Sequence, residues 1–393
     1  MKKRIVGGVV IMHPNHNNYG TSLQGFATVK ILQKLDYPFR IIRYKKRRSL
    51  SEILKTAPGL MKSGAFGELR TQLFKRLDKI LHKEYAKNIK IRTNIINEFK
   101  AKYFDAISDY YKGYPNLCKG SKKYDVIFVG SDQVWGPLSL YSKFYNLFFV
   151  DKAVPQFSYA SSFGVSNIFP WQLNGTKAYL DKMDAIGVRE IRGKEIVDSL
   201  SFNKAKVVVD PTMLLSKDEW EQAMVASSYN MDEPYLFSYI LGPRKDIRKE
   251  IMELGRKTGL KVISFNHTDW YESADENFGD IPIYNANPLD FIKLLRNAAY
   301  VCTDSFHGTV FSIIFHKKFL TFYRQQPTSS KSTHSRIDSL LGTFHLQERL
   351  CKNDPFNQIV RPIDYKNVDI ILDRLRKDSM DFLKDSLELE KSK

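Results

Sequence analysis

Long hydrophobic runs and cysteines are both scarce in this sequence, and each scarcity excludes a class of protein. The longest apolar stretches, such as Ile5–Met12, fall far short of the roughly 20 residues that span a bilayer, so we expect no membrane-spanning helix. The cysteines, Cys118, Cys302 and Cys351, are odd in number and have the spacing of neither a disulfide framework nor a metal site. Both observations favour a soluble protein of the reducing cytoplasm.

The start of the chain also lacks the cleavage site of a signal peptide. Met1–Arg4 is basic, but the short apolar run that follows leads directly into a polar segment without a small-residue cleavage motif. We therefore interpret this run as the first buried strand of the fold.

Negative charge is the scarcer sign, because 61 Lys and Arg residues outnumber 43 Asp and Glu residues and give a formal net charge of +18. Such a balance attracts anions, which include nucleic acids, lipid headgroups and phosphorylated substrates. The sequence contains none of the usual nucleic-acid-binding motifs, and its basic residues are not interleaved with aromatic ones. We therefore expect no nucleic-acid partner.

One stretch, residues 45–100, concentrates the positive charge. Its leucines recur at helical spacing, at Leu69, Leu73, Leu77 and Leu81. The pattern predicts a helical insertion with a basic outer face. The charges fit an ordinary solvated surface, and they also fit peripheral contact with the anionic inner face of the membrane.

Strands and helices alternate along most of the chain. The predicted strands are Arg4–Met12, Phe39–Tyr44, Tyr124–Val129, Gln156–Ala160, Ala185–Val188, Lys206–Val209, Tyr235–Leu241, Lys261–Phe265, Ala299–Thr303 and Lys318–Tyr323. Helical patterns separate most of them, as Thr21–Leu35 does between the first two, and this alternation predicts parallel sheets. With 393 residues, of which 43% are hydrophobic, the chain can form two cores. We therefore predict an α/β fold of two Rossmann-like, doubly wound lobes that face a cleft.

The predicted lobes divide the chain near its middle. The N-terminal lobe covers residues 1–175 and includes the basic insertion, the C-terminal lobe covers residues 176–350, and residues 351–393 form a C-terminal helical tail. Because ligands bind at the carboxyl ends of parallel strands, the polar loops that follow the strands are the candidates for the site.

The segment Thr303–Thr309 has the most specific pattern. It connects a predicted strand to a predicted helix, so His307 stands at a strand's carboxyl end and beside a helix N-terminus that can bind an anion. A histidine in this place can transfer protons near neutral pH. Gly308 would allow a tight turn, and Ser305 lies at the helix start. The alternative is that His307 only caps the helix.

Arginines follow other predicted strands. Arg189 comes after Ala185–Val188, where its guanidinium could hold a carboxylate or phosphate by two hydrogen bonds, or could pair with a neighbouring acidic residue. Arg324 and Arg336 flank a polar loop rich in Ser and Thr, which could close over an anion or could be an ordinary surface loop.

The loop between the first strand and the first helix, Asn15–Gly20, is another place where substrates bind in such folds. It lacks the G-x-G-x-x-G spacing of dinucleotide sites, and the chain also lacks a Walker motif and an H-E-x-x-H motif. No cysteine or carboxylate set accompanies His13 and His16, so we expect no metal. Tyr19 and Trp135 could stack on a sugar ring or belong to the core.

Several short motifs, taken in their order, resemble the polysaccharide pyruvyltransferase family. Together they cover roughly residues 5–350 and leave out the basic stretch and the C-terminal tail. The motifs are Asn18-Tyr19-Gly20 with Leu23-Gln24, Gly130-Ser131-Asp132-Gln133-Val134-Trp135, Tyr159–Gly164, Val188-Arg189-Glu190, Asp210-Pro211-Thr212, Asp304–Gly308, and Ser335–Asp338 with Leu340-Leu341.

The resemblance implies a GT-B-like fold and transfer of pyruvate from phosphoenolpyruvate to two hydroxyls of one sugar. The product is a cyclic ketal, made in the biosynthesis of cell-surface polysaccharide such as capsule or exopolysaccharide. The resemblance also implies a sugar acceptor, lipid-linked or free, and no cofactor besides the donor substrate. His307 matches the position of the proposed acid and base. Candidates for holding phosphoenolpyruvate are Arg189, Ser305, Gly308, Arg324 and Arg336, and candidates for holding the acceptor are Asn18, Tyr19, Gln24, Asp132 and Gln133.

Two other functions fit the same observations. The predicted fold and its helix N-terminus would also suit a GT-B glycosyltransferase that uses a nucleotide-sugar donor. The positive charge would suit a protein without enzymatic activity that binds membrane surfaces or nucleic acid. Thermal stabilisation by phosphoenolpyruvate, by a nucleotide sugar, or by neither separates the three functions.

Overall fold

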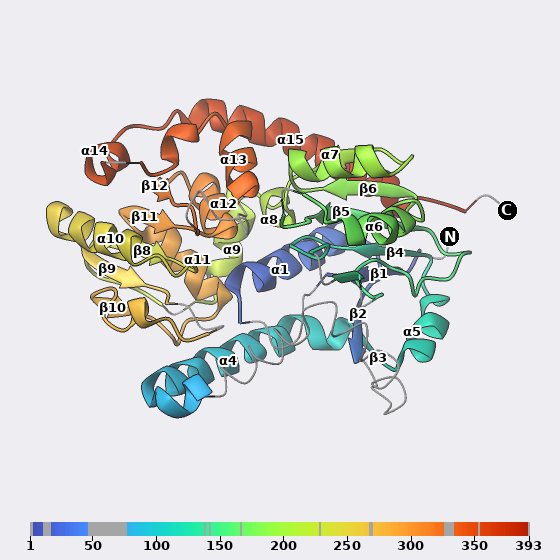
Figure 1. Ribbon diagram of the computed structural model, residues 1–393, viewed down its shortest axis with the longest axis horizontal. Coiled ribbons are helices and arrows are strands. Elements are labelled where there is room, and N and C mark those ends of the chain that lie inside the picture. Colours follow the sequence, from blue (N-terminus) through green and yellow to red (C-terminus); the bar gives the residue numbers. More distant parts are fainter. Residues whose placement is uncertain are drawn as a thin grey trace.

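The computed structural model describes residues 3–10, 17–45, 77–136, 139–140, 143–165, 167–227, 229–266, 270–325, 334–352 and 354–391 of the chain. These residues form two β-sheets with helices packed around them, and the two units lie side by side (Figure 1). The predicted fold class, two doubly wound α/β lobes, is confirmed.

The first sheet has the strand order β3-β2-β1-β4-β5-β6-β7, and every strand is parallel to its neighbours. The bounds are β1 Val6–Val9, β2 Phe39–Lys45, β3 Ser108–Lys112, β4 Val126–Val129, β5 Gln156–Ser161, β6 Ala185–Val188 and β7 Ala205–Val207. The central strands β1, β4 and β5 are buried along their whole length, as expected of strands covered on both faces. Glycine is required in β1, because Cβ atoms at Gly7 and Gly8 would lie 2.8 Å from the Tyr124 ring and 2.5 Å from the Phe39 ring.

The second sheet has the order β10-β9-β8-β11-β12 and is also parallel. Its strands are β8 Tyr235–Tyr239, β9 Lys261–Ser264, β10 Ile281–Pro282, β11 Tyr300–Thr303 and β12 Lys318–Thr321. In each sheet the strand order reverses beside the lobe's first strand, between β1 and β4 and between β8 and β11. Ligands of such sheets bind outside the carboxyl ends of the strands at this reversal, so the two reversals indicate where the site lies.

Helices connect the strands. Their bounds are α1 Tyr19–Lys34, α4 Lys83–Phe104, α5 Tyr114–Ser121, α6 Leu173–Leu180, α7 Ile191–Leu200, α8 Pro211–Leu214, α9 Lys217–Met224, α10 Lys245–Thr258, α11 Pro288–Asn297, α12 Phe306–Ile314, α13 His334–Thr343, α14 Pro355–Ile359 and α15 Tyr365–Leu387. Asn18, Asp210 and Ser305 cap α1, α8 and α12 with their side chains. These caps start all three helices just beyond the carboxyl ends of strands.

The boundary between the lobes differs from the predicted one at 175–176. Strands β6 and β7 belong to the first sheet, so the change from one sheet to the other lies between Val207 and Tyr235. A short buried strand does not reveal from its own sequence which sheet it joins, and this is why the boundary was placed too early. As a consequence, Arg189 belongs to the first lobe.

Helix α15 contains most of the predicted C-terminal tail and returns to the first lobe (Figure 1). The Ser379 hydroxyl accepts a hydrogen bond from Val209 N at 3.0 Å, and Arg376 Nε donates to Met213 O at 2.6 Å. At its start, the ring of Tyr365 stacks on a histidine of the second lobe. The helix therefore fastens the two lobes together.

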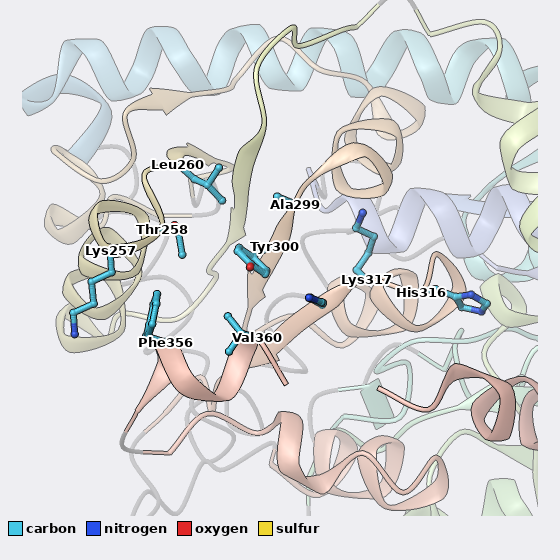
Figure 2. Close-up of a pocket in the computed structure, with 10 residues that line it drawn as sticks. Lys257, Thr258, Leu260, Ala299, Tyr300, His316, Lys317, Phe356 and Val360 are labelled. Atoms are coloured by element: carbon cyan, nitrogen blue, oxygen red, sulfur yellow. The ribbon is translucent and has the colours of Figure 1, made fainter. Parts of the chain in front are cut away.

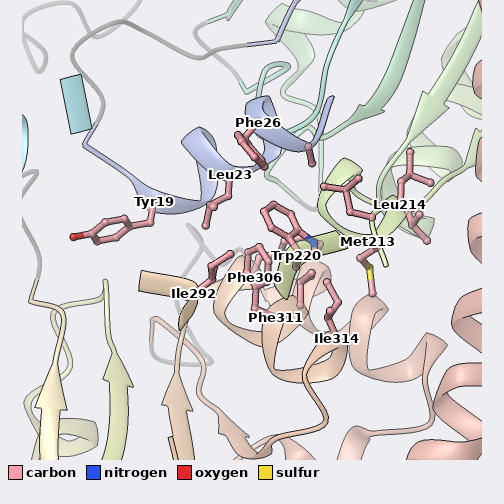
Figure 3. Packing of buried hydrophobic residues seen from close by; sticks show 14 of the residues in the cluster. Tyr19, Leu23, Phe26, Met213, Leu214, Trp220, Ile292, Phe306, Phe311 and Ile314 are labelled. Atoms are coloured by element: carbon pink, nitrogen blue, oxygen red, sulfur yellow. The ribbon is translucent and has the colours of Figure 1, made fainter. Parts of the chain in front are cut away.

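Helix α1 lies between the lobes and packs against α8, α11 and α12 (Figure 3). Phe26 stacks on Trp220 with ring centroids 5.7 Å apart, and Tyr19 stacks on Phe291 at 4.6 Å. One apolar core therefore continues from the first lobe into the second. This packing holds the first turn of α1 beside the first turn of α12.

Residues 77–82 and helix α4 are the described part of the predicted basic insertion, whose residues 46–76, with Leu69 and Leu73, lie outside the described residues. The helical prediction is confirmed for Lys83–Phe104, and the helix exposes Lys83, Lys87 and Lys90. Arg92 points inward instead: it is 2% exposed and donates to Asn266 O at 2.6 Å and Ile283 O at 2.5 Å. The insertion therefore braces the second lobe as well as carrying charge.

Candidate functional site

Loops that follow strands of both sheets meet between the lobes. Asp132 follows β4, Arg189 follows β6, Asp210 follows β7 and His307 follows β11. We call the buried group that these loops form the central cluster. Its members are Ser131, Asp132, Gln133, Arg189, Glu190, Asp210, His307, Arg324 and Arg336.

His307 lies in the first turn of α12 and is 6% exposed. Its Nε2 atom is 3.5 Å from Asp210 Oδ2, which is too long for a good hydrogen bond. The other edge of the ring faces α1, where a Cβ atom at Gly20 would lie 2.2 Å from Nδ1. The first turns of three helices therefore fix the position of the imidazole.

Asp210 connects both lobes through one carboxylate. It accepts hydrogen bonds from Ser131 Oγ at 2.6 Å, from Arg189 Nη1 at 3.1 Å, and from the Thr212 amide at 3.0 Å and hydroxyl at 2.7 Å. Burial would raise the pKa of Asp210, but His307, Arg189 and the Ser131 hydroxyl outweigh burial and hold the pKa well below its usual range. Asp210 is therefore a fixed negative charge beside the His307 ring.

Arg189 lies at the centre of the cluster with its side chain 1% exposed. Its guanidinium carbon is 4.1 Å from the centroid of the Phe306 ring, which makes a cation–π contact. Besides Asp210, it faces Asp132, with Nη2 3.9 Å from Oδ1. The predicted alternative, a structural ion pair with a neighbouring acidic residue, is also present, because Nε lies 3.8 Å from Glu190 Oε2.

Asp132 has a backbone φ of +84°, which few residues other than glycine adopt and which is retained mostly at functional sites. Thr21 Oγ1 donates to its carboxylate at 2.8 Å. Burial would raise the pKa of Asp132, but Arg189 and His307 outweigh it, and the pKa is lowered. Asp132 is therefore a second fixed negative charge beside the imidazole.

Arg336 enters the cluster from the first turn of α13. The Gln133 amide oxygen accepts from Arg336 Nη1 at 2.7 Å and from Nη2 at 3.0 Å. Burial first, and then the charges of Arg189 and Arg324, lower the pKa of Arg336 to about 9, which leaves it charged at neutral pH. Arg324 follows β12, with its Nε atom 3.8 Å from Asp304 Oδ2.

The cationic side chains of the cluster have more buried donors than the protein satisfies. Within the described residues, no hydrogen-bond partner exists for Nε and Nη2 of Arg189, for Nε of Arg324 and Arg336, or for Nε2 of His307. Native proteins pair the great majority of buried polar groups, because an unpaired one is costly. Several unpaired cationic donors in one place favour an anionic ligand such as a carboxylate or a phosphate.

Tyr19 does not face the cluster, contrary to its predicted contact with the acceptor. It is fully buried in the core between the lobes, its hydroxyl donates to Ala286 O at 2.9 Å, and burial raises its pKa to about 12. Trp135 is likewise core, 2% exposed. The motif around Tyr19 therefore holds α1 against the second lobe rather than stacking on a sugar.

Gln24 and Asn18, two of the predicted acceptor-binding residues, both make structural contacts. Gln24 is fully buried, and its amide nitrogen donates to the carbonyls of Val10 and Thr21, the latter at 3.1 Å. The Asn18 side chain caps α1 by accepting from Gly20 N at 2.8 Å. A resemblance of motifs does not distinguish a residue that contacts substrate from one that holds the loop in place.

Ser305 and Gly308 shape the start of α12 without offering their polar groups to the cluster. The Ser305 hydroxyl accepts from Gly308 N at 3.4 Å, so this amide is used within the helix cap. Gly308 lies inside the helix rather than in a tight turn. A Cβ atom there would be 2.4 Å from Thr303 Oγ1, so glycine permits close packing of α12 on β11.

The cluster also contains two residues for which the sequence analysis predicts no role, Asp210 and Ser131, and Glu190, which it predicts only as a possible ion-pair partner of Arg189. Asp210 stands at a strand's carboxyl end, which is the same signal that identified Arg189. Its place before Pro211 suggests only a helix cap, which it also is. The pairing of Asp210 with His307 joins residues far apart in the chain, and no local pattern predicts it.

A groove of about 620 Å³ lies away from the central cluster, at the amino ends of the second sheet's strands (Figure 2). Lys257, Tyr300, Lys317 and Phe356 are among its lining residues, and no predicted site residue is. Helices α10 and α12 end beside it, and helix C-termini carry partial negative charge that lysines stabilise. We therefore assign these lysines to helix stabilisation, and the site to the central cluster.

Two further findings concern the described residues only. In them, no group of three or more His, Cys, Asp or Glu side chains is placed to hold a metal ion. His13 and His16 lie outside this part of the chain. Likewise, no described helix is both long enough and apolar enough to cross a membrane.

Comparison with known proteins gives a family and a fold. The chain matches the family described as polysaccharide pyruvyl transferase over residues 18–326. A solved structure from Listeria monocytogenes, assigned as a UDP-N-acetylglucosamine 2-epimerase, is similar with a TM-score of 0.50, 11% identity and coverage of 95% of both chains. No curated protein matches the sequence.

Other solved structures resemble the chain less in shape. The UDP-GlcNAc 2-epimerase from Neisseria meningitidis aligns with a TM-score of 0.45 and 12% identity, over 95% of this chain and 99% of that one. The glycotransferase of kitacinnamycin aligns with a TM-score of 0.48 and 9% identity, over 98% and 100%. Likeness at such identity concerns the fold alone, and the GT-B-like prediction is confirmed by the Listeria structure.

Proposed function

The chain belongs to the polysaccharide pyruvyl transferase family, and from this membership and the central cluster we propose that it transfers pyruvate from phosphoenolpyruvate to two hydroxyls of one sugar. The product is a cyclic ketal on a cell-surface polysaccharide or its precursor. The reaction needs one group that moves protons and several that hold a donor with two anionic ends.

The unpaired cationic donors carry this proposal. Phosphoenolpyruvate presents a carboxylate and a phosphate close together, and each group accepts hydrogen bonds from a guanidinium in a bidentate manner. Arg189 Nη2, Arg336 Nε and Arg324 Nε are buried N–H groups without hydrogen-bond partners among the described residues. A donor with two anionic ends would satisfy these groups and offset their burial.

Most members of the cluster then have a part in the reaction. Arg189, Arg324 and Arg336 hold the donor and stabilise the negative charge that gathers on the leaving phosphate. His307 gives a proton to the methylene carbon and later accepts one from a sugar hydroxyl. Asp210, which is ionised and lies 3.5 Å from Nε2, keeps the ring oriented. Asp132 and Gln133 line the first-lobe side, where the acceptor enters.

The acceptor can be lipid-linked, in which case the enzyme acts at the inner face of the membrane. The support for this proposal is the positive charge of residues 45–100, which includes the exposed Lys83, Lys87 and Lys90 of α4. Each such residue near anionic lipid contributes about 1 kcal/mol. Salt-sensitive co-sedimentation with phosphatidylserine liposomes is expected, and its absence at low salt would contradict membrane contact.

The test of the function is phosphate release from phosphoenolpyruvate in the presence of a panel of lipid-linked and free glycosides. We expect release with some glycosides and a product whose mass increases by one pyruvylidene group. His307→Ala should lower the rate by roughly 10²–10⁴-fold, which is the usual contribution of a positioned acid or base. Stabilisation by a nucleotide sugar but not by phosphoenolpyruvate would favour a glycosyltransferase instead.

A further inference from the structure

Glu190 follows Arg189 at the end of β6 and turns its carboxylate back into the central cluster. Its side chain is 4% exposed. One carboxylate oxygen, Oε1, accepts a hydrogen bond from Ser162 Oγ at 2.7 Å, which fixes the carboxylate. Ser162 Oγ in turn accepts from Gly164 N at 3.1 Å, so the support for Glu190 is itself anchored to the backbone.

The second oxygen of Glu190, Oε2, is buried and has no hydrogen-bond partner within the described residues. Arg189 Nε lies 3.8 Å from it and is also without a partner there. A buried carboxylate oxygen and a buried N–H that face each other beyond hydrogen-bonding distance are both costly when left unpaired. A hydroxyl group satisfies both at once, because it accepts from the N–H and donates to the carboxylate.

The proposed reaction has a need that this pair meets. The two sugar hydroxyls lose two protons in all, the methylene carbon of phosphoenolpyruvate gains one, and the leaving phosphate takes the other. In the first addition the methylene carbon gains its proton while the attacking hydroxyl loses its own. One imidazole cannot donate and accept in the same step, so a second group must take the hydroxyl proton.

We propose that Glu190 is this second group and binds the first sugar hydroxyl between its Oε2 and Arg189 Nε; the inference rests on the proposed function. Protonated His307 gives its proton to the methylene carbon while Glu190 takes the hydroxyl proton, and the first C–O bond forms. Glu190 then gives its proton to the departing phosphate, and the bond from carbon to the phosphate oxygen breaks. His307 takes the proton of the second hydroxyl as the ketal closes. Both residues return to their starting states.

The alternative is a structural role, in which Glu190 only neutralises the charge of Arg189 and takes no part in the reaction. Binding and turnover separate the two roles. If Glu190 is a proton acceptor, its removal lowers kcat but does not change the binding of phosphoenolpyruvate. A lost structural partner releases Arg189 and weakens phosphoenolpyruvate binding first.

The experiment compares the full-length wild type with Glu190→Gln, which keeps the shape and the Ser162 contact but cannot accept the proton. Glu195→Gln is the matched control, because Glu195 is 55% exposed on α7 and pairs with Arg192. Calorimetry measures binding of phosphoenolpyruvate alone. Turnover is measured as phosphate release with the glycoside that supports it in the panel described above.

We expect Glu190→Gln to bind phosphoenolpyruvate within threefold of the wild type and to lose at least roughly 10²-fold in kcat, while Glu195→Gln changes neither. Added formate should restore part of the turnover of Glu190→Ala, but none in His307→Ala. A kcat of Glu190→Gln within threefold of the wild type, or loss of phosphoenolpyruvate binding in that variant, would overturn the role of Glu190. Absence of phosphoenolpyruvate binding in the wild type itself would instead overturn the proposed function.

Discussion

Replacing Gly20 with alanine substitutes no residue of the central cluster, but the added methyl group would displace the side chain of His307. The new Cβ atom would lie 2.2 Å from His307 Nδ1 and 2.5 Å from Cγ, whereas ordinary contact begins at 3.4 Å. The imidazole, which is packed between three helices, must therefore move by roughly 1 Å. A misplacement of about 1 Å at a reacting group costs roughly 10²-fold in rate.

Stability should respond differently from activity. Gly20 lies in the first turn of α1 and has no positive φ, so alanine suits its backbone. Alanine gains roughly 0.5–1 kcal/mol over glycine within a helix, which offsets part of the strain. We therefore expect Gly20→Ala to stay folded and to lose roughly 10²-fold in kcat.

The assay is phosphate release from phosphoenolpyruvate beside a thermal melt of each protein. Gly342→Ala is the control, since it is also a helical glycine and its Cβ would come no closer than 4.0 Å to another residue. Turnover of Gly20→Ala equal to that of Gly342→Ala would show that α1 does not position the imidazole, and the account of His307 would then fail.

Further predictions concern the charges that hold the site and the lobes. Asp210→Asn should cost about 3–5 kcal/mol of unfolding free energy, because it leaves buried Arg189 without its partner; urea denaturation measures this. The pKa of Asp210 is lower in the folded state than in the unfolded state, so ionised Asp210 stabilises the fold fully above the unfolded pKa of about 3.9, and this contribution is lost as the pH falls below that value. The difference in unfolding free energy between wild type and Asp210→Asn should therefore become smaller as the pH falls below about 3.9. A difference that does not change with pH would contradict an ionised Asp210. Arg189→Lys should raise the KM for phosphoenolpyruvate, since a point charge does not replace a bidentate fork, and unchanged kinetics in a destabilised protein would favour a structural ion pair. Arg92→Met should lower the free energy of unfolding by about 3 kcal/mol, because it leaves the carbonyls of Asn266 and Ile283 without their hydrogen-bond donor. A denaturation midpoint equal to that of the wild type would refute this bridge between the lobes.

Ten of the twelve described strands could be predicted from the sequence because buried parallel strands are short apolar runs between helical patterns, whereas the edge strands β3 and β10 were not predicted. Predicted strands such as Tyr124–Val129 and Ala299–Thr303 overlap β4 and β11 closely. The local sequence pattern did not show that β6 and β7 belong to the first sheet. Sheet membership is decided by pairing over long sequence distances, so the lobe boundary was placed too early.

Those site residues that stand at the carboxyl end of a predicted strand could be predicted from the sequence. His307 and Arg189 stand at such ends, and the structure brings both into one cluster. The partners that complete the cluster come from distant parts of the chain, as Gln133 does for Arg336. Tyr19 shows the opposite case, because an aromatic residue in a substrate loop proved to be core. Burial decides between these roles, and burial depends on the whole fold.

The most direct test of the central claim is the melting temperature of the wild-type protein with phosphoenolpyruvate, followed in Arg336→Met. The account predicts that phosphoenolpyruvate at 100 times its Kd stabilises the wild type by about 2.7 kcal/mol, and that the variant loses most of this stabilisation because Arg336 supplies part of the anion site. A nucleotide sugar should have no comparable effect. A wild-type melting temperature that does not change with phosphoenolpyruvate, or one that rises equally in Arg336→Met, would contradict the assignment of the central cluster as the donor site.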